Sequence, residues 1–231
     1  MPRPVKPRRR YDSSRRRAQA AQTRLDIATA ARGVFEEQGY TAAGIAKIAE
    51  AAGVVVETVY RAFGSKSGLF KAVIEAAVAG GAARAAVPVE ERPAIRAIID
   101  EPDPRRQLEL YAATQPGIHA RVGPLLRVLQ QAASSDAELA DLWRRLETER
   151  LEGMSNLPRL LAQRSALRSG LSVEEARDIL WTVNSQAVYD LLVEERRWSA
   201  KRYRDWIAFT LQRLLLSDDR PPKQALPRSA E

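Results

Sequence analysis

The chain has 231 residues, a length that suits a small domain joined to a medium one, or two closely associated helical parts. It contains no cysteine, which excludes disulfides and thiolate metal sites and is typical of a reducing compartment. No apolar run approaches the roughly 20 residues that a membrane span needs, and the Arg-rich N-terminus lacks the apolar core of a signal peptide. We therefore expect a soluble, cytoplasmic protein with no membrane partner.

The formal net charge of +8 is concentrated at the N-terminus. Residues 1–24 contain nine Lys and Arg residues against Asp12 alone, whereas the remainder of the chain is balanced. A basic segment on a neutral body favours a polyanionic partner, most simply nucleic acid, although a solubilising tail would have the same composition. The segment has no interleaved Trp, Phe or Leu face, which disfavours a membrane surface.

The first elements in chain order are a basic arm and a helix. Residues 1–20 contain three prolines and two arginine triplets with almost nothing apolar, so we predict a disordered arm. From about residue 23, Ile27, Ala31 and Phe35 recur at helical spacing, and Gly39 provides the stop.

The next segment, residues 41–66, contains two short helices. Ile45 and Ala49 lie on the inner face of the first, and Gly53 can adopt the positive φ of a tight turn. A second helix is predicted from about Val55 to Phe63. Two such helices joined by a tight turn form a helix-turn-helix, and the second is of a size to enter the DNA major groove.

The remaining pattern is helical as well. A helix ending at Gly80-Gly81 precedes further helices predicted over residues 104–121, 123–134, 136–165, 172–196 and 199–216. The breaks fall at Pro102 and Pro104, at Pro116-Gly117, at Ser134–Asp136 and at Gly170, and Ser172 with Glu175 forms a capping box. Since no segment alternates as a half-buried strand does, we predict an all-α fold: a three-helix headpiece and a body of about six helices. The Pro-rich tail, residues 218–231, is predicted to be disordered.

The last two predicted helices carry apolar stripes wider than one core contact requires. Trp181 and Leu191 belong to one of them, and Ile207 and Phe209 to the other. Paired with the same helices of a second copy they would form a four-helix interface. The alternative is a thick core within one subunit; we favour the homodimer.

Four linked pieces of residues 23–74 resemble the TetR family of bacterial regulators. They are F-x-x-x-G-Y (35–40), I-A-x-A-A-G-V (48–54), T-V-Y-R-x-F (58–63) and S-K-x-x-L-F (65–70). The resemblance implies a TetR-type DNA-binding domain over residues 21–80 and a ligand-sensing and dimerisation domain over residues 81–217. It also implies a homodimeric repressor, less often an activator, that a small-molecule effector releases from a palindromic DNA operator.

The resemblance assigns DNA contacts to particular positions. Thr58, Tyr60 and Lys66 occupy positions at which family members commonly contact DNA phosphates, and all three are hydrogen-bond donors. Arg61 is expected to read guanine through O6 and N7, and Glu57 to accept from cytosine N4. The remaining candidates are Val56 against a thymine methyl, Thr41 and Lys47 near the first short helix, and Arg15, Arg16 and Arg17 in the arm.

The sequence also departs from the family pattern. Val55 stands where Ser or Thr often caps the recognition helix, and Ala62 replaces a common His. Ala43 and Gly44 replace a frequent Thr or Ser, which leaves Thr41 to serve as the cap of the first short helix. The headpiece therefore has fewer phosphate ligands than usual, and we expect the basic arm to offset the loss.

The body offers no catalytic constellation. His119 is the single histidine, and no nucleophile, nucleotide-binding or metalloprotease motif is present, so we expect neither an enzyme, a cofactor nor a metal site. The alternatives for His119 are a ligand contact, a pH-sensitive group, or a packed or surface residue, and the last is the more common for a lone histidine. Candidate lining residues for an apolar or weakly polar effector are Tyr111, Trp143, Trp181, Asn184 and Gln186.

Asn184 stands out because an amide in an apolar helix needs a partner, either a ligand or Asn184 of the other subunit. The alternative to an operator-specific regulator is a sequence-nonspecific DNA-binding protein driven by the arm.

Overall fold

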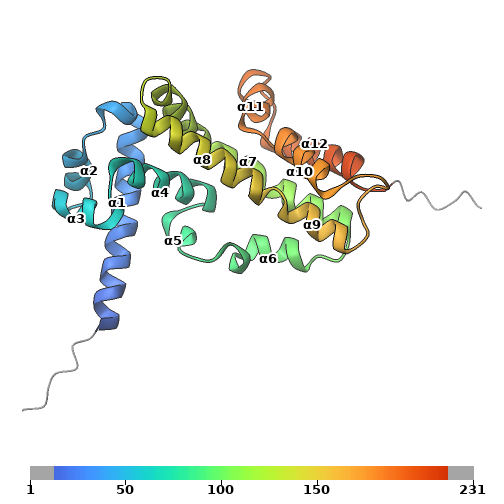
Figure 1. Ribbon diagram of the computed structural model, residues 1–231, viewed down its shortest axis with the longest axis horizontal. Coiled ribbons are helices and arrows are strands. Elements are labelled where there is room, and N and C mark those ends of the chain that lie inside the picture. Colours follow the sequence, from blue (N-terminus) through green and yellow to red (C-terminus); the bar gives the residue numbers. More distant parts are fainter. Residues whose placement is uncertain (1–12, 218–231) are drawn as a thin grey trace, which may run out of the picture.

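The computed structural model describes residues 13–217, which are almost entirely helical. The N-terminal part consists of α1 (Ser13–Ala42), α2 (Ile45–Ala51), α3 (Val56–Phe63) and α4 (Lys66–Ala79). Figure 1 shows α1 to α3 at one end of an elongated molecule, with the body extending away from them. The body consists of α5 (Ala82–Ala85), η1 (Val89–Glu91), α6 (Pro93–Asp100), α7 (Pro104–Ala133), α8 (Ala137–Gly153), α9 (Asn156–Gln163), α10 (Val173–Val183), α11 (Gln186–Tyr189), the π-helical turn η2 (Asp190–Glu195) and α12 (Ala200–Leu215).

The predicted all-α class is confirmed. Among the described residues no β-strand forms, and only an isolated bridge joins Leu167 to Leu216. None of the helices between residues 13 and 217 combines the length and the apolar character needed to cross a bilayer.

The first helix begins earlier than the sequence suggested. α1 starts at Ser13, so the prediction of a disordered arm up to residue 20 is wrong for residues 13–20. The reason is local: alanine, arginine and glutamine, which dominate residues 15–22, are strong helix formers. Residues 1–12 of the predicted arm and the predicted tail, residues 218–231, lie outside the described residues.

The break predicted at Pro116-Gly117 is also wrong, because α7 runs unbroken through Pro116 and Pro124. Each proline removes one backbone hydrogen bond. Burial of Leu108, Ala112 and Leu125 along the same helix holds it continuous.

Other predicted helices are divided. The segment 136–165 forms α8 and α9, which are separated near Ser155, and the segment 172–196 is broken at Asn184 and Ser185. A further helix that the sequence reading missed, α6, begins at Pro93, a residue favoured in the first helical turn. The predicted capping box of Ser172 and Glu175 is present.

Two apolar clusters hold the molecule together. The first joins α1–α4 to the second half of α7 and the start of α8, through residues such as Val122 and Leu139. The second joins α6, the first half of α7, α9, α10 and α12. Since α7 contributes to both clusters, the headpiece is fixed to the body through that helix.

Candidate nucleic-acid interface

The turn between α2 and α3 has the geometry that the sequence predicted. Gly53 adopts φ +65°, and its N–H donates to the Glu50 carbonyl at 3.0 Å. The Val54 N–H donates to the Ala49 carbonyl at 2.9 Å. Ala49 is 2 % exposed, so its small side chain lets the two helices cross closely. An L-residue at Gly53 would be strained, because positive φ brings its Cβ against the backbone.

Behind this turn lies an aromatic cluster that explains two pieces of the family pattern. The Phe35 and Phe70 ring centroids are 4.6 Å apart, and Tyr40 lies 5.8 Å from Phe35 and 5.3 Å from Phe70. All three side chains are buried. The residues of F-x-x-x-G-Y and S-K-x-x-L-F therefore pack on each other and support α3 from the inside.

α3 presents distinct faces. Val59 is buried and Val56 is partly buried against the first apolar cluster, whereas Glu57, Tyr60 and Arg61 are exposed. Thr58 is half-buried, and its N–H donates to the Val55 carbonyl at 2.9 Å. The outward face therefore offers a carboxylate, a phenol and a guanidinium, which together can pair with base edges and phosphates.

The candidate phosphate ligands around α3 have different surroundings. The Lys66 ammonium lies 4.5 Å from the Tyr40 ring centroid and donates to the Thr41 carbonyl at 3.3 Å. Burial lowers the pKa of Lys66, and nearby Asp136 opposes that shift. Lys47 and the Thr41 side chain are exposed. The prediction that Thr41 caps α2 is wrong: Gly44 is the N-cap, without a side-chain hydrogen bond. Gly39 interrupts α1 with non-helical angles of φ 72° and ψ 173°, as the sequence predicted, and Thr41 belongs to the short turn that follows this kink.

α1 is tied to α3 by Arg24. Its guanidinium lies 4.1 Å from the Phe63 ring centroid and donates to the Ala62 carbonyl at the end of α3. Arg15, Arg16 and Arg17 are exposed on the first turns of the same helix. In Figure 1, α1 (blue) extends well past α3 on the side away from α4. The three arginines therefore lie on a helical extension of α1.

The sequence assigned no DNA contact to Val55 and marked it only as a residue that cannot cap α3. Val55 is 63 % exposed at the N-cap of α3. The signal was present in the sequence as a valine in a capping position, but its outward orientation could only come from the structure.

A second polar group of residues lies inside the body, on α7 and between α10 and α11. The Asn184 amide nitrogen donates to the Tyr111 hydroxyl at 2.7 Å and to the Gln115 side-chain oxygen Oε1 at 2.8 Å. His119 contacts the Asn184 oxygen through Nε2 and the Gln186 oxygen through Nδ1, both at 2.9 Å. Asn184 thus finds its partners within its own chain, and neither a ligand nor a second Asn184 is needed to satisfy it.

The charge state of His119 follows from this enclosure. The ring is 6 % exposed, and burial lowers its pKa, an effect that its contacts with Asn184 and Gln186 oppose. Both ring nitrogens face amide oxygens, so a neutral ring, with one N–H, can donate to only one of them. Four titratable or charged groups contact or influence the ring: Arg150 on α8, Tyr189 on α11, Asp190 on η2 and Tyr203 on α12. Tyr111 on α7 is linked to the ring through Asn184.

The candidate effector residues are only partly brought together. Tyr111, Asn184 and Gln186 share the buried polar cluster. Trp143 instead packs against the first apolar cluster, and Trp181 is 36 % exposed beneath the Arg150 guanidinium.

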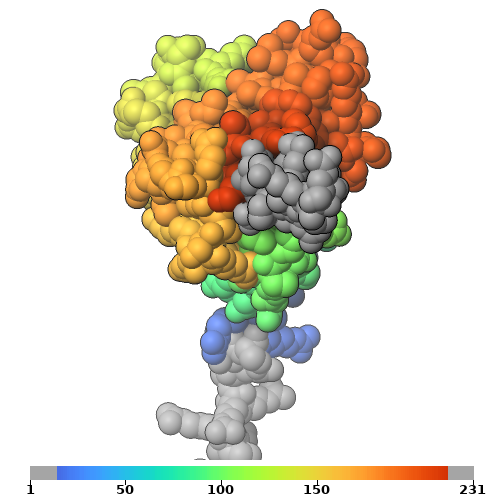
Figure 2. Space-filling view, turned by 90° about the vertical axis from the view of Figure 1, so that its right-hand side faces the viewer, coloured from blue at the N-terminus to red at the C-terminus, as the bar shows by residue number. Residues whose placement is uncertain are grey.

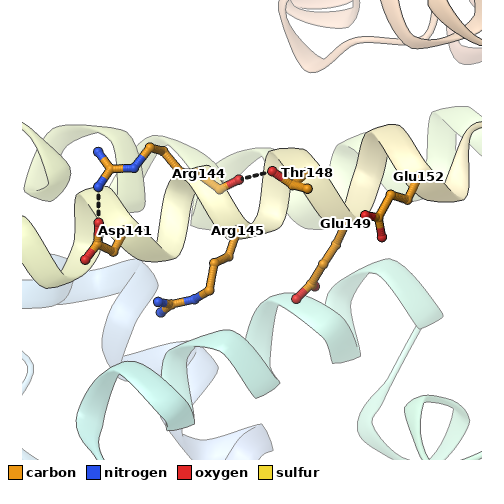
Figure 3. A pocket seen from close by; sticks show the side chains of 6 residues that line it. All are labelled: Asp141, Arg144, Arg145, Thr148, Glu149 and Glu152. Atoms are coloured by element: carbon orange, nitrogen blue, oxygen red, sulfur yellow. Dashed lines mark hydrogen bonds and ion pairs between the residues drawn. The ribbon is translucent and has the colours of Figure 1, made fainter.

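The surface groove drawn in Figure 3 lies elsewhere, along the face of α8 toward α4. It encloses about 350 Å³ and contains none of the candidate effector residues. Its lining is charged and open to solvent, unlike an apolar ligand cavity. The residues are Asp141, Arg144, Arg145, Thr148, Glu149 and Glu152.

These features define an all-α helix-turn-helix protein. Residues 27–73 match the family model described as bacterial regulatory proteins of the tetR family. The predicted resemblance is therefore confirmed on a fifth of the chain, where the motif pieces lie. No similar protein was found among curated protein sequences.

Solved structures extend the likeness to the whole fold. A protein of Mesorhizobium loti assigned to the TetR family of transcriptional regulators has a TM-score of 0.64 at 18 % identity, covering 84 % of this chain and 96 % of that one. NalD of Pseudomonas aeruginosa, the secondary repressor of the MexAB-OprM multidrug efflux pump, has a TM-score of 0.62 at 23 % identity, covering 86 % and 99 %. FadR of Bacillus subtilis, solved with stearoyl-CoA, has a TM-score of 0.61 at 20 % identity, covering 81 % and 96 %. The fold is that of TetR-family transcriptional regulators.

Proposed function

We propose that this chain is a sequence-specific, double-stranded-DNA-binding transcriptional regulator. The observation that carries the proposal is the outward face of α3, where Glu57, Tyr60 and Arg61 are exposed on a helix held by the Gly53 turn. A helix of this kind enters the major groove, where a guanidinium pairs with guanine and a carboxylate accepts from cytosine. The family match over residues 27–73 supports the same reading.

Phosphate contacts surround this reading face. Thr58 and Tyr60 lie on α3, Lys66 at the start of α4, Lys47 on α2 and Thr41 shortly before it. The α1 extension adds Arg15, Arg16 and Arg17, and Arg24 fixes its direction relative to α3. Val56 is better placed for packing than for base contact, because its side chain is partly buried.

The test compares two substitutions on an operator selected from random duplexes with the purified protein. Arg61→Ala should cost about 1–3 kcal/mol of binding and relax the preference at one base pair, whereas Lys66→Ala should weaken binding to all sequences and reduce the salt slope. Arg159→Ala is the matched control, since Arg159 is exposed on α9, far from α3 in Figure 1. An unchanged base preference in Arg61→Ala would remove that residue as a reader.

The proposal includes a homodimer formed by α10, α12 and the π-helical turn between them. Trp181, Leu191 and Phe209 expose 36 %, 52 % and 58 % of their surface on these elements. Figure 2, which views the end of the body, shows α12 in red beside the protruding orange segment of α11 and η2. Phe209→Arg should yield monomers in sedimentation equilibrium. Val89→Arg, at a similarly exposed position on η1, should not.

A small apolar or weakly polar effector that releases the dimer from a palindromic operator completes the proposal, with repression as the outcome. Such a compound should raise the melting temperature and lower operator affinity together. The second candidate function, nonspecific DNA binding, is favoured by the basic N-terminal segment. It predicts nearly equal affinity for operator and scrambled duplexes, whereas a specific regulator predicts a ratio on the order of 10³ or more.

A further inference from the structure

Val55 is the most exposed large apolar side chain among residues 15–217, at 63 %. It occupies the N-cap of α3, with extended backbone angles of φ −85° and ψ 154°. Its side chain makes no capping hydrogen bond. An isopropyl group is thus held in solvent at the N-terminal end of the proposed recognition helix.

α3 shares the lack of a side-chain cap with α2, α5, α6 and α9. A side-chain oxygen at the N-cap accepts a backbone N–H in the first turn of six other helices. Those residues are Ser65, Asp103, Asp136, Ser172, Ser185 and Ser199. Ser and Asp caps are thus common in the described residues, and the extended backbone at Val55 would accept Ser or Thr.

Among residues 13–217, Val55 belongs to neither apolar cluster. The neighbouring Val56 packs partly against the first apolar cluster, but Val55 faces outward. Two unfavourable features coincide here, an uncapped helix start and an exposed apolar group. A partner that buries the isopropyl group would offset both.

We propose that Val55 is a specificity-determining residue that reads the C5 methyl of a thymine. This proposal rests on the proposed DNA-binding function. In helix-turn-helix proteins the N-terminal residues of the recognition helix meet base edges in the major groove. The thymine methyl is the apolar group that a base pair presents there. Glu57 and Arg61, two and six residues further along, supply the polar contacts of the same helix.

The experiment removes the methyl groups from the DNA and from the protein in turn. Each thymine of the selected operator half-site is replaced singly by deoxyuridine, which lacks the C5 methyl. Affinities are measured for the wild type, Val55→Ser, Val55→Ile and the control Val89→Ser, which alters a valine that is 52 % exposed on η1. Serine restores a capping oxygen, so the melting temperature of the Val55→Ser protein should be no lower than that of the wild type.

One thymine position should carry the signal. Replacing it should weaken wild-type binding about fourfold per half-site, the value of one buried methyl group, and about 15-fold in both half-sites. Val55→Ser should bind the thymine and deoxyuridine duplexes equally, whereas Val55→Ile and Val89→Ser should discriminate as the wild type does.

Two results would overturn the assignment. In the first, the wild type prefers the operator over scrambled DNA but discriminates thymine from deoxyuridine no better than Val55→Ser does. This result would refute the role of Val55 and leave the proposed function standing. The same holds if Val55→Ser instead changes the oligomeric state without DNA, since Val55 then contacts another protein chain. A wild type with equal affinity for operator and scrambled duplexes would refute the proposed function itself.

Discussion

The headpiece and the body of this molecule use polar side chains in opposite ways. In the headpiece the core around Phe35, Tyr40 and Phe70 is aromatic, and the polar groups of α3 face solvent. In the body, polar side chains such as His119 and Asn184 are buried and bonded to one another. An exposed polar face is available to an external partner, whereas an enclosed network fixes the relative position of the helices that contribute to it.

The largest effect should come from the headpiece core. Phe70 is fully buried between Phe35 and Tyr40, so Phe70→Ala should lower the free energy of unfolding by about 3–5 kcal/mol. Urea denaturation followed by circular dichroism measures the loss. Val89→Ala, at an exposed site, should remain within about 0.5 kcal/mol of the wild type. Equal losses in the two variants would contradict a single well-packed aromatic core.

The next effect should come from the body network. Asn184→Leu keeps the branched shape of the side chain but removes one hydrogen-bond partner each from His119 Nε2, Gln115 Oε1 and the Tyr111 hydroxyl, which should cost about 2–3 kcal/mol. Asn156→Leu alters an exposed amide on α9 and should cost little. If both variants unfold at the same urea concentration as the wild type, the network does not stabilise the body.

A smaller effect should appear on acidification. Because burial lowers the pKa of His119 in the folded state, the unfolded chain binds a proton first as the pH falls. The contribution of His119 to stability is therefore complete above about pH 6.5, the unfolded value, and is lost as the pH falls toward the lowered folded value.

The matched variant is His119→Gln, which cannot titrate. The stability difference between wild type and variant should shrink between pH 7.5 and pH 5.0. As the chain has one histidine, its ring proton resonances also report the folded pKa without ambiguity. A midpoint at or above 6.5 in the folded protein would refute the effect.

The smallest effect is expected at Tyr203. Its hydroxyl is buried without a hydrogen-bond partner, so Tyr203→Phe should leave the melting temperature unchanged or slightly raised. Tyr111→Phe is the informative contrast, because the Tyr111 hydroxyl accepts a hydrogen bond from Asn184. Its removal should lower the free energy of unfolding by about 1 kcal/mol. A large loss in Tyr203→Phe would mean that its hydroxyl has a partner.

The sequence predicted the headpiece well because its signals are local. The spacing of Ile45, Ala49 and Val59 and the turn at Gly53 depend on neighbours within a few residues, and the structure has the same turn. The order of the motif pieces led to the same family that the comparison found for residues 27–73.

The body was harder because its organisation depends on contacts distant in sequence. Pro116 looked like a helix end, yet packing carries α7 through it. Asn184 looked like a ligand contact or a subunit contact, yet its partners lie about 70 residues earlier on α7. Hydrophobic periodicity in the sequence cannot predict such pairings, because it indicates which face of a helix is buried but not which residues bury it.

Footprinting of the purified protein on the DNA upstream of its own gene tests most directly whether the outward face of α3 lies in a major groove. Dimethyl sulfate should find guanine N7 protected in two symmetry-related half-sites, centred about one helical turn or a multiple of it apart. Arg61→Ala should lose protection of one guanine in each half-site and keep the rest. Uniform protection along the duplex, or a pattern that Arg61→Ala leaves intact, would contradict base reading by α3.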